Sequence, residues 1–331
     1  MFEEIEQNQE SAGRSVWELV SHSPLEGMWD LRGVPLKIVA KRVWNSTNED
    51  NLFGRASQLA YYFFFALFPM LVAASSILGL AAKSATQIYV ALLNRVATLI
   101  PPAAFGIVMD TFNQTTQHST PGKITLGLLT ALWSASVGVS AIQDTLNAVY
   151  KVKEKRGYWR ARGEAVLLTI AVAIVFTIAL ATLLGCDVGA RLLEHQFMGA
   201  IIVAWFTRII GWIVASVLVV LVFALLYFFS PDVEKRKWRW FTPGSAIGLF
   251  GWVAVSLSLR LYLHWFNSFS VTYGSLGAVI ILLLWFYLFG LMLLVGAEVN
   301  SEIEAAVLEE SVLKQKTEQG AVIPIDPDKT K

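Results

Sequence analysis

Polar side chains recur at helical spacing in one otherwise apolar part of the chain. They are Ser136, Ser140, Gln143 and Asn147, with Asp144 at the border of the group. The spacing i, i+4, i+7 and i+11 places the first four on one face of a helix. In hydrocarbon such a stripe must face protein or water. It therefore either lines the path of a solute or hydrogen-bonds to neighbouring helices, and the sequence leaves both interpretations open.

Glu298 stands at the end of a long uncharged stretch, within the sequence GAEVN. If a helix bundle draws this carboxyl group inward, it can take up a proton and couple transport to a proton gradient. The alternative is an ion pair at the membrane surface, which contributes little to stability when it is exposed. Glu298 is therefore a candidate residue of a translocation path.

Three further residues are candidates for the same path. Arg260 and His264 are one helical turn apart, and an arginine facing the bundle could hold a phosphate or carboxylate bidentately. The alternative for Arg260 is that its guanidinium snorkels to the membrane surface. Pro69 predicts a kink in the middle of an apolar helix, which frees a backbone carbonyl. Discontinuous helices build transporter sites, although proline is also tolerated for packing alone.

The composition predicts which elements must position these residues. The chain has 331 residues, of which 55% are hydrophobic and 15% charged, against about 25% charged in a soluble domain. The excess apolar surface must face lipid, which argues against a soluble enzyme. A net charge of +1 does not indicate a nucleic-acid partner. One cysteine excludes an internal disulfide, and four scattered histidines leave little for a metal, so no cofactor is expected.

Six largely uncharged stretches are long enough to cross a hydrocarbon core, which needs about 20 residues. Continuous apolarity of this length favours helices over barrel strands, which would be shorter and would alternate. The predicted fold class is all-α: a polytopic membrane bundle of six transmembrane helices. The predicted spans are 57–82, 124–146, 164–186, 209–230, 243–265 and 275–298.

The positions of lysine and arginine predict the orientation of the bundle. The loops 144–163 and 232–242 are rich in basic residues, and both should be cytoplasmic. Six spans then place the N- and C-termini on the cytoplasmic side. The first ten residues lack the basic segment of a cleaved signal peptide, so the first span is expected to stay in the membrane.

The connecting segments predict a simple domain organisation. Residues 1–55 form a cytoplasmic N-terminal segment, residues 56–300 the transmembrane domain, and residues 301–331 a polar cytoplasmic tail that is partly disordered. The stretch 34–45 predicts an amphipathic helix on the inner surface. The apolar run 96–109 is too short to cross and predicts an interfacial or re-entrant helix pair on the outer side.

Gly244 and Gly248 are four residues apart in the fifth predicted span. Small residues at this spacing let two helix backbones approach closely. The pair therefore predicts a tight helix contact near the inner end of this span.

Six segments, in their order and spacing, are similar to the BrkB/YihY family of bacterial inner-membrane proteins. The similarity extends from residue 35 to 305. The segments are SQLAYYFFFALFPM at 57–70, LWSASVGVSAIQDTLNAVYKVKEKR at 132–156, LLYFFSP at 225–231, WRWFTPG at 238–244, YGSLGAVIILLLWFYL at 273–288 and LLVGAEVNSE at 293–302.

The resemblance implies a six-helix inner-membrane protein. Some members are associated with virulence or serum resistance, a transport role is suspected, and some carry the label ribonuclease BN, a tRNA-processing nuclease. A metal-dependent nuclease needs clustered histidine and carboxylate ligands. None of the four histidines has another histidine or a matched carboxylate pair at ligand spacing, and His195, beside Glu194, lies on a predicted outer loop. We therefore do not expect an enzyme.

The function expected from these features is transport across the bacterial inner membrane. The intramembrane polar residues favour a transporter or a translocator of a lipid-like or anionic solute. The alternative is a non-transporting scaffold that organises lipid or envelope proteins. The expected partners are membrane lipids and such a substrate, with no nucleic acid. The sequence does not indicate an oligomeric state.

Overall fold

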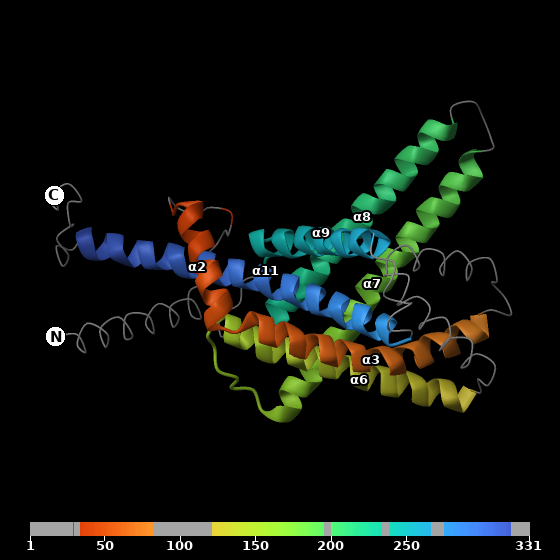
Figure 1. Cartoon of the computed structure of the whole chain (residues 1–331), viewed down its shortest axis with the longest axis horizontal. Helices are drawn as coiled ribbons and strands as arrows, with labels where there is room; N and C mark the ends of the chain where they lie inside the picture. Colours follow the sequence, from red (N-terminus) through yellow and green to blue (C-terminus); the bar gives the residue numbers. More distant parts are fainter. Residues whose placement is uncertain are drawn as a thin grey trace.

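The computed structural model describes residue 29 and residues 34–81, 121–194, 200–233, 238–265 and 275–318. Within these residues every regular element is an α-helix, as the sequence predicts. The helices are shown in Figure 1: α2 (Leu36–Glu49), α3 (Leu52–Ala81), α6 (Pro121–Val149), α7 (Tyr158–Glu194), α8 (Ala200–Phe229), α9 (Pro243–Trp265) and α11 (Ser275–Glu318).

Five segments in the described part of the chain are long and apolar enough to cross a membrane. They match the second to sixth predicted spans in order. The first predicted span, 57–82, falls in α3, which is not among the five. The five segments are Thr125–Val149, Tyr158–Ala190, Ile202–Phe229, Pro243–Trp265 and Leu276–Ser311.

The helices pack mainly in pairs, α3 with α6, α7 with α8 and α9 with α11, and the contact of α6 with α7 joins the first two pairs. In Figure 1 α3 runs beside α6, and α7 forms a long hairpin with α8 that crosses them obliquely. The long helix α11 packs against α9 and α3, and α2 crosses it. Because α11 contacts most of the other helices, it forms the centre of the bundle.

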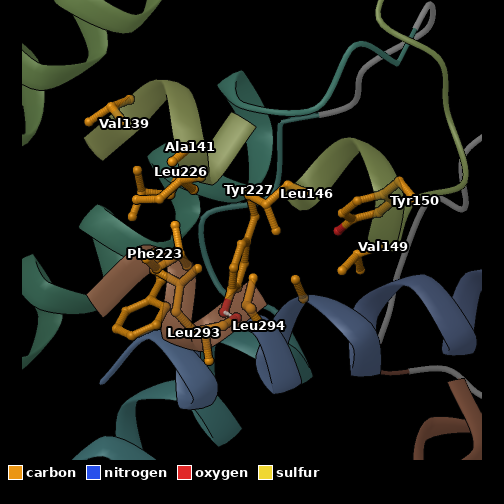
Figure 2. Packing of buried hydrophobic residues seen from close by; sticks show 14 of the residues in the cluster. Val139, Ala141, Leu146, Val149, Tyr150, Phe223, Leu226, Tyr227, Leu293 and Leu294 are labelled. Carbon is orange, nitrogen blue, oxygen red and sulfur yellow. Dashed lines mark hydrogen bonds between the residues drawn. The ribbon is translucent and has the colours of Figure 1, made fainter. Parts of the chain in front are cut away.

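A hydrophobic core lies where α3, α6, α8 and α11 meet. Leu59 of α3, Leu146 of α6 and Leu293 of α11 are fully buried. Figure 2 shows Tyr227 reaching from α8 toward α11, where its hydroxyl donates a hydrogen bond of 2.8 Å to the carbonyl of Leu293. This bond satisfies the polar end of a buried tyrosine, as such side chains require.

Backbone contact between α9 and α11 brings two glycines together. A side-chain carbon on Gly244 would collide with the carbonyl of Gly296, and one on Gly296 would collide with the Tyr227 hydroxyl and with the carbonyl of Gly244. The N–H of Gly244 donates to Asn300 Oδ1 over 2.9 Å. The tight helix contact predicted from Gly244 is therefore present, and α11 is the partner.

The segments predicted to share one side of the membrane lie at one end of the bundle. Ser301 of α11 donates from Oγ to the carbonyl of Val149 at the end of α6 (2.9 Å), and Lys151 pairs with Asp50. The helix α11 continues beyond 298, the predicted end of the sixth span, and its residues 301–307 are buried there. The outer segment 96–109 lies outside the described residues.

The predicted amphipathic segment 34–45 is helical as α2 and is docked on α11. Arg42 Nε lies 2.9 Å from Glu302 Oε2, and Ser46 Oγ donates to Glu302 Oε1 over 2.6 Å. The opposite side of α2 leaves Leu36 and Trp44 exposed. The helix therefore binds α11 through Val39 as well as through these polar side chains, and it also presents apolar side chains outward.

Candidate functional site

The first half of the predicted polar stripe is occupied by contacts within protein. Ser136 donates to the carbonyl of Trp133 in its own helix over 2.7 Å. Ser140 accepts a 3.0 Å hydrogen bond from Arg162 Nη1 of α7, and Arg162 also stacks over the Trp133 ring at 4.3 Å. The serine thus helps to fasten α7 to α6.

Asn147 closes the inner end of the stripe. Its Nδ2 donates to Glu154 Oε2 over 2.8 Å, and its Oδ1 accepts a 2.7 Å bond from the backbone N–H of Asp232. One amide therefore joins the end of α6 to the following loop and to the segment after α8. These contacts favour the helix-interface interpretation for Asn147.

Gln143 and Asp144 are placed differently from the rest of the stripe. Gln143 is buried, and its Nε2 has no hydrogen-bond partner among the described residues. Asp144 is exposed at the end of α6. Gln143 is thus the stripe residue whose polar group is left available by its described neighbours.

Arg156, from the loop between α6 and α7, is the centre of an ion network. Its side chain is 4% exposed and donates to Glu154 (2.7 Å), to Glu164 (2.6 Å) and to the carbonyl of Ser230 (2.9 Å). Asp232 Oδ1 lies 3.7 Å from its Nε. The hydrogen bonds from Arg156 lower the pKa of Glu154, and those bonds raise the pKa of Arg156 itself.

The ion network borders a cavity of about 740 Å³ between α7 and α8, the α7–α8 cavity. One end of the cavity is charged, and its wall toward the middle of the helices is apolar. Such a shape accommodates a ligand with a polar head and a hydrocarbon tail. The charged lining is Arg156, Arg160, Glu164 and Asp232, and the apolar wall includes Leu167, Leu168, Ala171, Leu225, Phe228 and Phe229.

A second cavity, of about 620 Å³, lies between α8 and α9 and carries no charged lining residue. Trp212 and Val220 of α8 and Phe250 of α9 are among its walls. None of the nine candidate path residues lines either of these two cavities.

Glu298 is 0% exposed, and neither of its carboxylate oxygens has a hydrogen-bond partner among the described residues. Its electrostatic neighbours come from three elements: Glu302 on α11, Glu49 and Asp50 at the end of α2, and Lys151 after α6. Glu302, one turn away, is satisfied by Ser46 and Arg42. The contrast singles out Glu298 as a buried carboxyl group without a partner in the described part of the protein.

The remaining candidates do not join Glu298. Arg260 and His264 are exposed on α9, which favours the snorkelling interpretation of Arg260. Pro69 lies inside α3, which stays helical to Ala81. The structure therefore distributes the nine predicted path residues over four helices: five on α6, Glu298 on α11, Arg260 and His264 on α9, and Pro69 on α3.

Comparison with models of protein families shows to which family the chain belongs. A family model described as "Virulence factor BrkB" matches residues 43–321, which is more than half of the sequence. The chain belongs to the BrkB family. The matched part of this BrkB-family protein contains Glu298, the ion network and both cavities.

Relatives of this BrkB-family chain carry two kinds of name. The ribonuclease-like protein YfkH of Bacillus subtilis (strain 168) is 34% identical over 253 residues, 75% of this chain and 88% of that protein. A UPF0761 membrane protein of Xanthomonas oryzae is 26% identical over 287 residues, 83% of this chain and 63% of that protein. The chain thus spans less than two thirds of the Xanthomonas protein. No solved structure matches the chain.

The sequence did not single out the ion network of this BrkB-family protein. In the sequence Arg156 is one of several basic residues in a predicted cytoplasmic loop, and Asp232 is far from Arg156 along the chain. The available signal was the alternation of charge in KEKR at 153–156, since a lysine- and arginine-rich loop that also carries glutamate can form internal ion pairs. Its link to Asp232 required the fold.

Replacing Asn147 by alanine is expected to lower the free energy of unfolding by about 2 kcal/mol, because the N–H of Asp232 and the carboxylate of Glu154 both lose a partner. Unfolding of the full chain in detergent, followed by circular dichroism, measures the change. The control is Ser136→Ala, whose hydroxyl bonds only its own helix among the described residues. Equal stability of both variants and the wild type would contradict the helix-joining role.

Proposed function

We propose that this protein is a bacterial inner-membrane transporter with six spans and both termini in the cytoplasm, and that it translocates a lipid-like or anionic solute. The observation that carries the proposal is Glu298, a fully buried carboxyl group without a described partner inside a candidate span. Ionisable groups within membrane segments are costly, and they usually mark ion or substrate pathways.

The proposed topology is supported by which segments lie together. Lys151 pairs with Asp50, and Arg239 pairs with Glu304 at 2.9 Å, so the basic loops contact the segment before α3 and the part of α11 that follows Glu298. Basic loops mark the cytoplasmic side of membrane proteins. With α3 counted as the first span, the proposed topology has both ends of the described bundle in the cytoplasm, and these contacts support it.

In the proposed mechanism Glu298 binds and releases a proton as the solute moves. Its neighbours Glu302, Asp50 and Lys151 belong to elements that meet around α11, so a shift of α2 or of the α6 end would change the charge around it. The proposal assigns no reaction to the chain. The ribonuclease-like name belongs to the Bacillus relative.

The test uses the full chain in vesicles that contain fluorescent phosphatidylethanolamine or phosphatidylglycerol, with a proton gradient across the membrane. Wild-type protein is expected to move a labelled lipid between leaflets at a rate that depends on the gradient. Glu298→Gln is expected to slow this movement about tenfold, within the usual range of coupling between two binding events. Chemical quenching of the outer label measures the rate.

The matched control is Glu309→Gln, on the same helix but with a half-exposed side chain. It is expected to leave the rate unchanged. If the wild type moves neither lipid faster than empty vesicles, the transporter proposal fails and the scaffold alternative gains. In a scaffold, serine in place of the exposed Leu36 and Trp44 of α2 would impair function, whereas Glu298→Gln would not.

A further inference from the structure

The charged end of the α7–α8 cavity has balanced charge. Arg156 and Arg160 contribute two positive groups, and Glu164 and Asp232 two negative groups. A simple anion would meet two carboxylates there, and a simple cation would meet two guanidinium groups. A ligand that carries both a phosphate and an ammonium group can pair with both kinds of side chain.

The charged groups differ in how far their neighbours already use them. Arg156 is 4% exposed and holds Glu154 and Glu164, so it positions the network. Arg160 is 76% exposed, and its one described bond runs from Nε to Glu164 Oε1 at 3.2 Å. Its terminal nitrogens therefore have no partner among the described residues and are available to an anionic group of a ligand.

The carboxylates supply the complementary half of the site. Asp232 Oδ2 accepts the backbone N–H of Lys155 at 2.8 Å, which fixes its orientation, while its side chain stays 18% exposed. Glu164 lies between Arg156 and Arg160 and is 32% exposed. Both carboxylates retain lone pairs that can accept hydrogen bonds from a ligand.

The cavity is long enough for a lipid headgroup and the first part of an acyl chain. Along α7 its lining runs from Arg160 to Ala171, a rise of about 16 Å at the helical repeat. The charged residues occupy the first part of this length, and the apolar part from Leu167 to Ala171 rises about 6 Å. Leu167 on this wall is 68% exposed, so an acyl chain can lie against it from the bilayer. The helices α7 and α8 form the long hairpin seen in Figure 1, and residues of both line this cavity.

We propose that the α7–α8 cavity binds a zwitterionic phospholipid whose headgroup carries a primary ammonium. Arg160 donates to the phosphate, Glu164 and Asp232 accept from the ammonium, and the wall formed by α7 and α8 holds an acyl chain. A quaternary ammonium has no N–H to donate, so a choline headgroup pairs less well. The binding of this lipid does not depend on the proposed function. That the same lipid is also the transported solute rests on the proposed function.

Native mass spectrometry of the full chain tests the site. Delipidated protein is incubated with equal amounts of palmitoyl-oleoyl phosphatidylethanolamine, phosphatidylcholine and phosphatidylglycerol. The wild type is expected to retain mainly the phosphatidylethanolamine. Arg160→Ala and Asp232→Asn are each expected to reduce this retention about tenfold, as for one lost charge-assisted hydrogen bond. Asp232→Asn keeps an oxygen for the N–H of Lys155.

The control is Lys41→Ala, which removes an exposed cation of α2 outside the cavity and should leave retention unchanged. Equal retention of the three lipids, a preference for phosphatidylglycerol, or unchanged retention in both cavity variants would overturn the site. Retention without movement in the vesicle assay would keep the site and refute the proposed function. Lipid movement that depends on Glu298, without selective retention of phosphatidylethanolamine, would support the proposed function and refute the lipid site.

Discussion

Replacing Arg156 by alanine is expected to lower the free energy of unfolding by about 2–3 kcal/mol, the upper part of the usual range for hydrogen bonds to charged groups. The variant would leave Glu154 and Glu164 without their shared cation and the carbonyl of Ser230 without its donor. These groups join the α6–α7 loop, the start of α7 and the end of α8. Denaturant unfolding in lipid-free detergent measures the loss.

The matched control is Arg160→Ala, the same substitution one turn into α7. Its exposed pair with Glu164 is worth at most about 1 kcal/mol, so equal losses in the two variants would contradict the network.

The dependence of stability on acidic pH provides a second test of the network. Because Arg156 lowers the pKa of Glu154 below its usual 4.5, that stabilisation is complete above pH 4.5 and is lost as the pH falls through the lowered pKa. Arg156→Ala should remove this acid-side loss.

Replacing Gly296 by alanine is expected to destabilise the bundle by about 3 kcal/mol, at the upper end of the usual cost of overpacking. The added carbon would meet the hydroxyl of Tyr227 and the backbone of Gly244. A backbone cannot yield as a flexible side chain does, so α9 must move away from α11. The displacement would also strain the bond from Gly244 to Asn300.

Gly290→Ala provides the control for this prediction on the same helix. A side-chain carbon there would lie 3.4 Å from Leu59 Cβ, an ordinary contact. Alanine also gains up to about 1 kcal/mol of helix propensity over glycine at either position. Unfolding in detergent should therefore show Gly290→Ala near the wild type and Gly296→Ala well below it. Similar stabilities would show that α9 and α11 can separate without cost.

The pattern of apolar stretches predicted most of the helices because each one must satisfy its own backbone in lipid. The second to sixth predicted spans correspond to α6, α7, α8, α9 and α11. The amphipathic segment 34–45 appears as α2. The close approach at Gly244 was also predicted, since a small residue is required wherever two backbones touch. These are local properties that a chain carries in its residue order.

Burial within the bundle could not be predicted in the same way. In water an apolar face marks the core, but in a membrane lipid-facing and protein-facing residues are equally apolar. Leu167 is largely exposed and Leu146 fully buried, and nothing in their types distinguishes them. The stripe on α6 likewise leaves path and interface as alternatives, and the contact of Ser140 with Arg162, which favours an interface at that residue, depends on the fold.

The residue order alone determined an all-helical membrane protein with basic loops at one end and polar groups within its spans. The tertiary structure decided which polar groups have partners. Asn147 and the loop residue Arg156 both contact Asp232, which lies near them because α8 ends beside α6. Glu298 has no hydrogen-bond partner among its described neighbours, although charged residues at the ends of α2 and α6 lie near it. The physical reason is that a hydrogen bond requires two groups to be close in space. Groups on helices that are far apart in the chain become close only when the helices pack.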